Sequence, residues 1–152
     1  KEKTKISNRE IGIIVKGFNL VAGLTAFENV ELPLIYRKLP KGKRKEITIH
    51  ALEKVSLGNR MTHLPSQMSG GQQQRVAIAR ALAAEPPIIL ADEPTGNLDK
   101  NSGSEVMRIL FSLNKVGKTI ILITHDENIA KQAQRIIRIS DGKVEEDVIM
   151  EK

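Results

Sequence analysis

The sequence predicts an α/β fold built on a parallel sheet, because short apolar runs alternate with helical patterns. Residues 88–91 and 119–124 are apolar and β-branched, which is typical of buried strands. Between them, residues 101–116 place apolar side chains on one face of a predicted helix. A third apolar run, 11–15, predicts another strand. Strands joined by helices in this way are typical of parallel sheets.

Two helices are predicted in the first half of the chain. Thr25 and Glu28 have the spacing of a capping box, so a helix is expected from residue 26 to about 37. Pro33 lies within it and predicts a break or kink. Apolar residues at helical spacing predict a second helix over 43–56.

A third helix is predicted after a second capping box. Ser69 and Gln72 form that box, and residues 72–84 are rich in strong helix formers. Two prolines end the helix at 86–87. A short helix over 127–133 should then precede a strand pair.

That strand pair is predicted over 135–140 and 143–147. Asp141 and Gly142 between the two segments are a turn signal for a hairpin. The C-terminal part of the chain is therefore expected to end in antiparallel strands.

Composition limits the function classes. The 152 residues contain no cysteine, which excludes a disulfide scaffold, a cysteine-ligated zinc site and a thiol nucleophile. No apolar run approaches the roughly 20 residues of a membrane helix, so direct membrane insertion is not expected. The net charge is +6. The basic residues gather at 37–45, where a solvated loop and the start of a helix are expected, with an acidic protein or lipid headgroup as the alternative partner. No nucleic-acid partner is expected.

Polar residues follow two of the predicted strands. Asp92 and Glu93 come after the first, and His125 with its neighbours Thr124 and Asp126 comes after the second. Parallel strands bring their carboxyl ends to one edge, where ligands of α/β sheets bind. There, one carboxylate suits Mg²⁺ and the other suits a general base, whereas His125 suits a phosphate or a water. The alternatives are helix capping for the carboxylates and an ordinary hydrogen bond for the histidine.

Residues 69–72, Ser-Gly-Gly-Gln, open a helix whose free N–H groups could bind an anion. The alternative is a plain flexible cap. Arg75 and Arg80 in the helix that follows are explained equally well by solvation of its surface.

Three segments in register resemble the ATP-binding subunits of ABC transporters. Residues 68–82, MSGGQQQRVAIARAL, are similar to the signature motif and its helix. Residues 88–99, IILADEPTGNLD, resemble the Walker B strand, the catalytic glutamate and the D-loop. Residues 124–126 resemble the segment of the switch histidine. The segment PTGNLD at 94–99, together with FNL at 18–20 and ENVELPL at 28–34, looks most like the family branch that serves lipoprotein release and macrolide export.

The resemblance implies a partial P-loop NTPase (RecA-like) sheet with an inserted ABC-type helical subdomain. Residues 1–19 would be a core strand with a Q-loop-like segment, 20–85 the helical subdomain, and 86–152 the C-terminal half of the ATPase core. The partners implied are a transmembrane permease and a second ATP-binding subunit in a homodimer. The location implied is cytoplasmic, peripheral on the inner face of the cell membrane.

The resemblance also implies roles for individual residues, with ATP and Mg²⁺ as cofactors. Asp92 would support the metal, Glu93 would be the general base and His125 would contact the γ-phosphate. Asp99 would bridge the two halves of the dimer. Ser69, Gly70, Gly71 and Gln72 would bind ATP held by the other subunit.

The chain departs from the family pattern in two places. The phosphate-binding motif G-x-x-x-x-G-K-[ST] does not occur in the 152 residues. Lys16 stands where the Q-loop glutamine is expected; an ammonium group only donates hydrogen bonds and would repel Mg²⁺. An alignment slip or an outward-pointing lysine is the alternative.

Several hypotheses follow from these departures. The first is that the chain is an N-terminally truncated ATPase subunit that powers a permease but does not hydrolyse ATP alone. The second is a degenerate interaction module that keeps only docking and dimer surfaces. The third, a chromosome-maintenance or repair ATPase, is disfavoured because no heptad run is present. An incomplete sheet should also expose edges and apolar faces, so rearrangement or self-association is expected.

Overall fold

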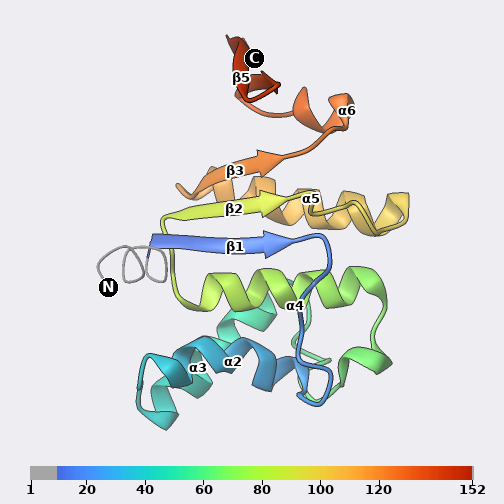
Figure 1. Ribbon diagram of the computed structural model, residues 1–152. Coiled ribbons are helices and arrows are strands. Elements are labelled where there is room, and N and C mark those ends of the chain that lie inside the picture. Colours follow the sequence, from blue (N-terminus) through green and yellow to red (C-terminus); the bar gives the residue numbers. More distant parts are fainter. Residues whose placement is uncertain (1–9, 152) are drawn as a thin grey trace.

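A three-stranded parallel sheet forms the centre of the computed structural model, which describes residues 10–151 (Figure 1). The strands β1 (Ile11–Val15), β2 (Ile88–Asp92) and β3 (Thr119–Ile123) pair in the order β1-β2-β3. The predicted α/β fold class and all three strands are therefore confirmed. Residues 1–9, which belong to the first predicted unit, lie outside the described part.

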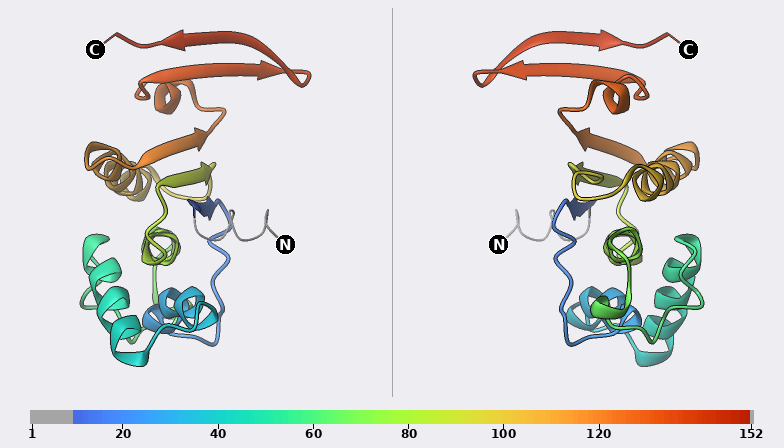
Figure 2. Two further views of the ribbon diagram at one scale, coloured as in Figure 1. Left: turned by 90° about the vertical axis from the view of Figure 1, so that its left-hand side faces the viewer. Right: turned by 90° about the vertical axis from the view of Figure 1, so that its right-hand side faces the viewer.

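Two helices cover one face of this sheet. The helix α4 (Gly70–Ala83) lies beside β1, and α5 (Lys100–Lys115) lies beside β2 and β3 (Figure 2). Ile14 and Ile89 point into the resulting core and are completely or almost completely buried. Because strand side chains alternate between faces, Ile13 and Ile121 point to the other face, where about half of each is exposed. The sheet is thus packed on one face and open on the other.

The first helical segment packs below α4 in Figure 1. It consists of α2 (Ala26–Tyr36) and α3 (Lys41–Lys54), and its apolar positions Val30 and Leu52 are fully buried. The helix predicted from residue 26 to about 37 is confirmed. Of the break or kink predicted at Pro33, the break is wrong, because α2 continues through it and the Arg37 N–H donates to the Pro33 carbonyl. Burial of residues on both sides of Pro33 offsets the one helical hydrogen bond that a proline removes. A single 3₁₀ turn (Pro65–Gln67) then leads into α4.

The C-terminal part stands apart from the parallel sheet. A short helix, α6 (Glu127–Ala130), leads to the antiparallel strands β4 (Arg135–Ser140) and β5 (Lys143–Ile149). The predicted hairpin is confirmed, and Asp141 and Gly142 have the positive φ values that its turn requires. The hairpin forms a separate two-stranded sheet (Figure 2).

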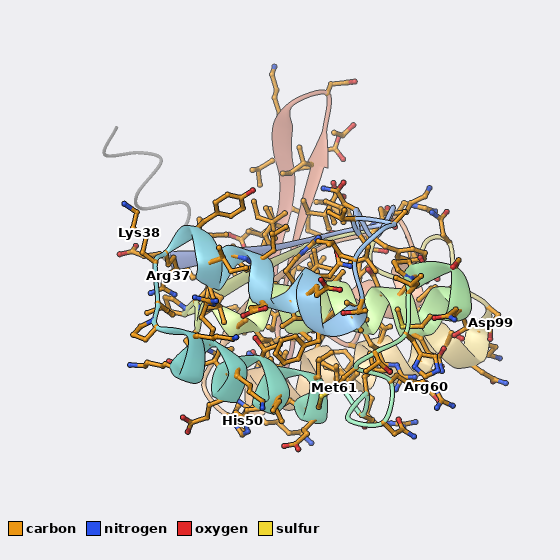
Figure 3. All side chains as sticks on the ribbon, turned by 90° about the horizontal axis from the view of Figure 1, so that it is seen from below. Arg37, Lys38, His50, Arg60, Met61 and Asp99 are labelled. Carbon is orange, nitrogen blue, oxygen red and sulfur yellow. The ribbon has the colours of Figure 1, made fainter. Side chains whose placement is uncertain are left out.

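Two surface features bear on function. Within residues 10–151, no helix combines the length and the apolar character needed to cross a bilayer. The basic turn that begins at Arg37 and Lys38 lies at the end of the molecule opposite Asp99 (Figure 3). Its charge is therefore remote from Asp99.

Candidate functional site

The candidate site lies where β2 and β3 end. The two strands are parallel, with Asp92 opposite Ile123, so the residues that follow them emerge at the same edge. The Glu93 N–H donates to the Ile123 carbonyl at 2.9 Å, which extends the pairing by one residue. The structure therefore brings Glu93 and His125 together, although they are separated by 32 positions in the sequence.

Glu93 and His125 contact each other directly. One carboxylate oxygen of Glu93, Oε1, lies 2.6 Å from Nδ1 of the His125 ring and accepts the His125 backbone N–H at 3.0 Å. The His125 side chain is 87% exposed, whereas the Glu93 side chain is only 24% exposed. The ring is thus fixed by a shielded carboxylate while its other nitrogen, Nε2, remains available to a ligand.

The backbone of Glu93 adopts an unusual conformation. Its φ is +46°, a region that residues other than glycine rarely occupy. The Gly96 N–H donates to the Glu93 carbonyl at 3.0 Å and closes a turn at this point. Residues in such conformations persist where the surroundings hold them, and they are frequent at functional sites.

Asp92, at the end of β2, is exposed beside this pair. Mg²⁺ in proteins is commonly bound by one or two carboxylates together with waters and the phosphates of a substrate. Among residues 10–151, no group of three or more potential metal ligands is gathered in one place. The donor set therefore fits a magnesium ion held by one protein carboxylate and a phosphate-bearing ligand, rather than an all-protein metal cage.

The N-terminus of α4 is the second part of the candidate site. The Ser69 hydroxyl accepts the Gln72 N–H at 3.2 Å, and the Gln72 side chain accepts the Ser69 N–H at 3.0 Å. The predicted capping box is confirmed. A Cβ on Gly71 would lie 2.8 Å from Cβ of Ser102, so only glycine allows α4 to approach α5 this closely. Gly70 is less restricted, with Leu98 at 3.4 Å.

Asp99 occupies the N-cap of α5. Its carboxylate accepts the backbone N–H groups of Asn101 and Ser102 at 3.1 Å each. Hydrogen bonds from the Ser102 side chain and backbone hold the pKa of Asp99 below its ordinary value. The expected role of Asp99 between two subunits stays a prediction, because its bonds in this structure are within the chain.

Lys16 follows directly after β1, beside the turn after β2. Its side chain lies across Gly96, where an added Cβ would be 2.8 Å from Cδ of Lys16. The Asn97 side-chain amide donates to the Lys16 carbonyl at 3.3 Å. Lys16 is thus packed against the Glu93 turn through its backbone and its aliphatic carbons, while the residue as a whole is exposed.

Sequence analysis missed the residues that connect α4 to these loops. Gln74 received no role, and solvation seemed to explain Arg75 and Arg80 equally well. The structure shows Gln74 fully buried and Arg80 hydrogen-bonded to the carbonyls of Phe18 and Asn19. Arg75 donates to the Val55 carbonyl. Arg80 gave one signal, a long polar side chain between two alanines, whereas Gln74, between Gln73 and Arg75, gave none. The partners of both residues are backbone atoms far away in the sequence.

Comparison with known proteins identifies the class of this domain. Residues 1–96 match the ABC transporter family. An ABC transporter ATP-binding protein from Thermotoga maritima is 50% identical over 141 residues, which cover 93% of this chain and 60% of the relative. The chain therefore belongs to the ABC transporter ATP-binding family, and the family resemblance of its motifs is confirmed.

Two further relatives sharpen this assignment. A Methanocaldococcus jannaschii ABC transporter ATP-binding protein, MJ0796, is 52% identical over 151 residues, covering 96% of this chain and 64% of the relative. A macrolide export ATP-binding/permease protein from Rhodospirillum rubrum is 49% identical, covering 90% of this chain and 21% of the relative. The chain thus spans less than two thirds of the length of these relatives.

A solved structure has the same arrangement. The dimeric, post-hydrolysis state of the MJ0796 cassette bound to ADP and phosphate superimposes with a TM-score of 0.85 at 46% identity, covering 99% of this chain and 67% of that one. The ABC cassette fold is therefore established for this chain, and nucleotide binding is the property that the family implies.

Proposed function

We propose that this chain supplies the hydrolysis and signature elements of an ATP-binding subunit that powers a membrane permease. The observation that carries the proposal is the contact between Glu93 and His125 beside Asp92, at the carboxyl ends of two parallel strands. A shielded carboxylate next to an exposed imidazole suits activation of a water and contact with a terminal phosphate. The relatives include an export protein that joins an ATP-binding part to a permease.

Each predicted residue has a part in this proposal. Glu93 accepts a proton from the attacking water, and His125 orients the γ-phosphate through Nε2. Asp92 binds Mg²⁺, which neutralises charge on the phosphates when present. At the N-terminus of α4, Ser69, Gly70, Gly71 and Gln72 bind the phosphate of ATP held by a second subunit.

The dimer and the location belong to the same proposal. The MJ0796 cassette is dimeric in its solved structure, so we propose a homodimer here in which Asp99 contributes to the subunit contact. We also propose a location in the cytoplasm at the inner face of the membrane, where a permease partner would hold the domain. A P-loop is absent from the 152 residues. Turnover is therefore expected only where a further polypeptide segment supplies that loop.

ATP hydrolysis tests the proposal. The protein to assay is the parent protein, meaning this chain together with the polypeptide segment that supplies the P-loop. Magnesium-dependent turnover is expected, and Glu93→Gln should lower kcat by roughly 10² to 10⁴-fold, the usual contribution of a general base. The 152-residue chain alone should show no turnover above its own Glu93→Gln variant. Robust, Glu93-dependent turnover by the chain alone would contradict the need for a P-loop. A parent protein without turnover would favour the interaction module instead.

The specific observation behind that alternative is Lys16. A cation near the metal disfavours Mg²⁺ binding, so Lys16→Gln in the parent protein should lower the Mg²⁺ concentration needed for half-maximal turnover. Lys16→Met, which removes the charge but restores no acceptor, is the matched control. Equal turnover and equal Mg²⁺ dependence in all three proteins would show that Lys16 does not matter.

A further inference from the structure

Gln74 is a residue of α4 whose polar side chain is buried next to the ends of β1 and β2. None of its surface is exposed. Its Nε2 donates to the Pro94 carbonyl at 2.6 Å and to the Val15 carbonyl at 3.3 Å. Both partners are acceptors, so the nitrogen of the amide must face them. A single side chain thus joins α4 to the turn after Glu93 and to the residue before Lys16.

The other end of this amide has no partner. Oε1 of Gln74 is buried and accepts no hydrogen bond from the described residues. A buried acceptor without a donor is unfavourable, and methionine would fill the same space without it. Packing therefore gives no reason for an amide at this position, whereas the two carbonyl contacts do.

The contact with Pro94 bears on the strained conformation of Glu93. With φ at +46°, this residue needs its neighbours to hold it. Its own carbonyl is held by the Gly96 N–H, and the next carbonyl, that of Pro94, is held by Gln74. The side chain of Gln74 therefore fixes the turn that aims Glu93 at His125.

A second residue of α4 holds only one of the two loops. Arg80 donates to the carbonyls of Asn19 at 2.7 Å and Phe18 at 3.2 Å. Phe18 and Asn19 have positive φ values of 60° and 54°. Arg80 makes no such contact with the Glu93 turn, so it provides a comparison for Gln74.

We infer that Gln74 is a positioning residue that makes the N-terminus of α4, the Glu93 turn and the segment after β1 move as one unit. Ser69–Gln72 begin the same helix, and Gln74 lies two residues beyond them. A displacement of α4 is thereby transmitted to Glu93 and to Lys16 through one amide group. The hydrogen bonds of Gln74 are present whether or not the chain is part of an ATPase. Only the claim that a movement of Glu93 affects catalysis rests on the proposed function.

Amide hydrogen exchange in the 152-residue chain tests the inference. Gln74→Met should accelerate exchange at least tenfold at residues 95–97 and 16–19. Arg80→Met should accelerate exchange only at 16–20. Gln73→Met is the matched control, because Gln73 lies on the same helix and donates to the Met68 carbonyl instead; it should leave both loops unchanged. The ring resonances of His125 should shift in Gln74→Met alone.

Two results would overturn the inference. Unchanged exchange in Gln74→Met, or acceleration spread evenly over the whole chain, would overturn the inference, since the latter is what a purely structural role predicts. Should the Met variant not fold, Gln74→Asn, whose amide is one methylene shorter, must give the same two-loop pattern. If the wild-type parent protein does not hydrolyse ATP but Gln74→Met still accelerates exchange in both loops, the proposed function is refuted and the inference remains intact.

Discussion

The helical layer buries its apolar side chains, whereas the C-terminal hairpin leaves most of its own exposed. In the helical layer, Val30 of α2, Leu52 of α3 and Ile78 of α4 are fully buried. In the hairpin, Ile139 and Ile149 are 68% and 76% exposed, and β5 is exposed along its whole length. Helices that pack on one another complete their own core, whereas a two-stranded ribbon has no second layer to cover it. Stability should therefore be concentrated in the first region.

The largest test of this comparison is truncation of apolar side chains. Leu52→Ala and Ile78→Ala should each lower the free energy of unfolding by about 2–5 kcal/mol, because each leaves a cavity in a closed core. Ile139→Ala should change it by less than about 0.5 kcal/mol, since its side chain is mostly exposed. Urea unfolding followed by circular dichroism measures all three. Equal losses in the two regions would show that the hairpin has a core of its own.

The next effect concerns the closest approach between α4 and α5. Gly71→Ala should destabilise the chain by about 1–3 kcal/mol, because its Cβ collides with Ser102. Gly42→Ala is the control: an added Cβ meets nothing within 4 Å there, and alanine is the better helix former. Adding Ser102→Gly should restore most of the stability that Gly71→Ala loses. Failure of that rescue would mean that the collision is not the cause.

A smaller effect is expected at the open face of the parallel sheet. Ile13, Ile121 and Ile123 are each about half exposed there, so the chain is expected to self-associate. Ile121→Lys should weaken the association about tenfold, equivalent to about 1.4 kcal/mol. Val116→Lys, an exposed position at the end of α5, is the control. Sedimentation at several protein concentrations measures the association constant of each variant. A wild-type chain that stays monomeric at all concentrations would refute the expected self-association.

The smallest effect is the contribution of two carboxylates to stability in acid. Hydrogen bonds from Ser102 lower the pKa of Asp99, and the Arg135 guanidinium lowers the pKa of Asp147. A lowered pKa in the folded state stabilises the chain above the ordinary value of about 4, and this contribution is lost as the pH falls through the lowered pKa.

Asparagine at either position separates the two regions. Asp99→Asn should flatten the decline of stability as the pH falls below about 4, the ordinary pKa of an aspartate, because asparagine caps α5 without titrating. Asp147→Asn should leave the decline of global stability unchanged if the hairpin unfolds separately from the core. Unfolding in urea at several pH values measures both. The same flattening in both variants would indicate that the hairpin and the core unfold together.

Much of the fold was predictable because the local signals agree. Capping residues such as Thr25 and Ser69 set the starts of two helices, and apolar runs set all three parallel strands. The helix around Pro33 was predicted correctly, but the break at Pro33 was not, because a local rule does not include the energy of burying neighbouring residues. The motifs likewise determined the family, since they depend on residue type and spacing alone.

Tertiary structure decided what local patterns cannot contain. The contact of Glu93 with His125 requires two strands in register. The carbonyl that follows Glu93, that of Pro94, accepts a hydrogen bond from Gln74, 20 positions earlier in the chain. Gln74 and Arg80 act on carbonyl groups, which every residue carries, so their partners leave no trace in the sequence. The sequence by itself therefore determined the elements, the motifs and the family. Packing alone decided how α4 holds the strand ends, because that depends on where backbone atoms meet in space.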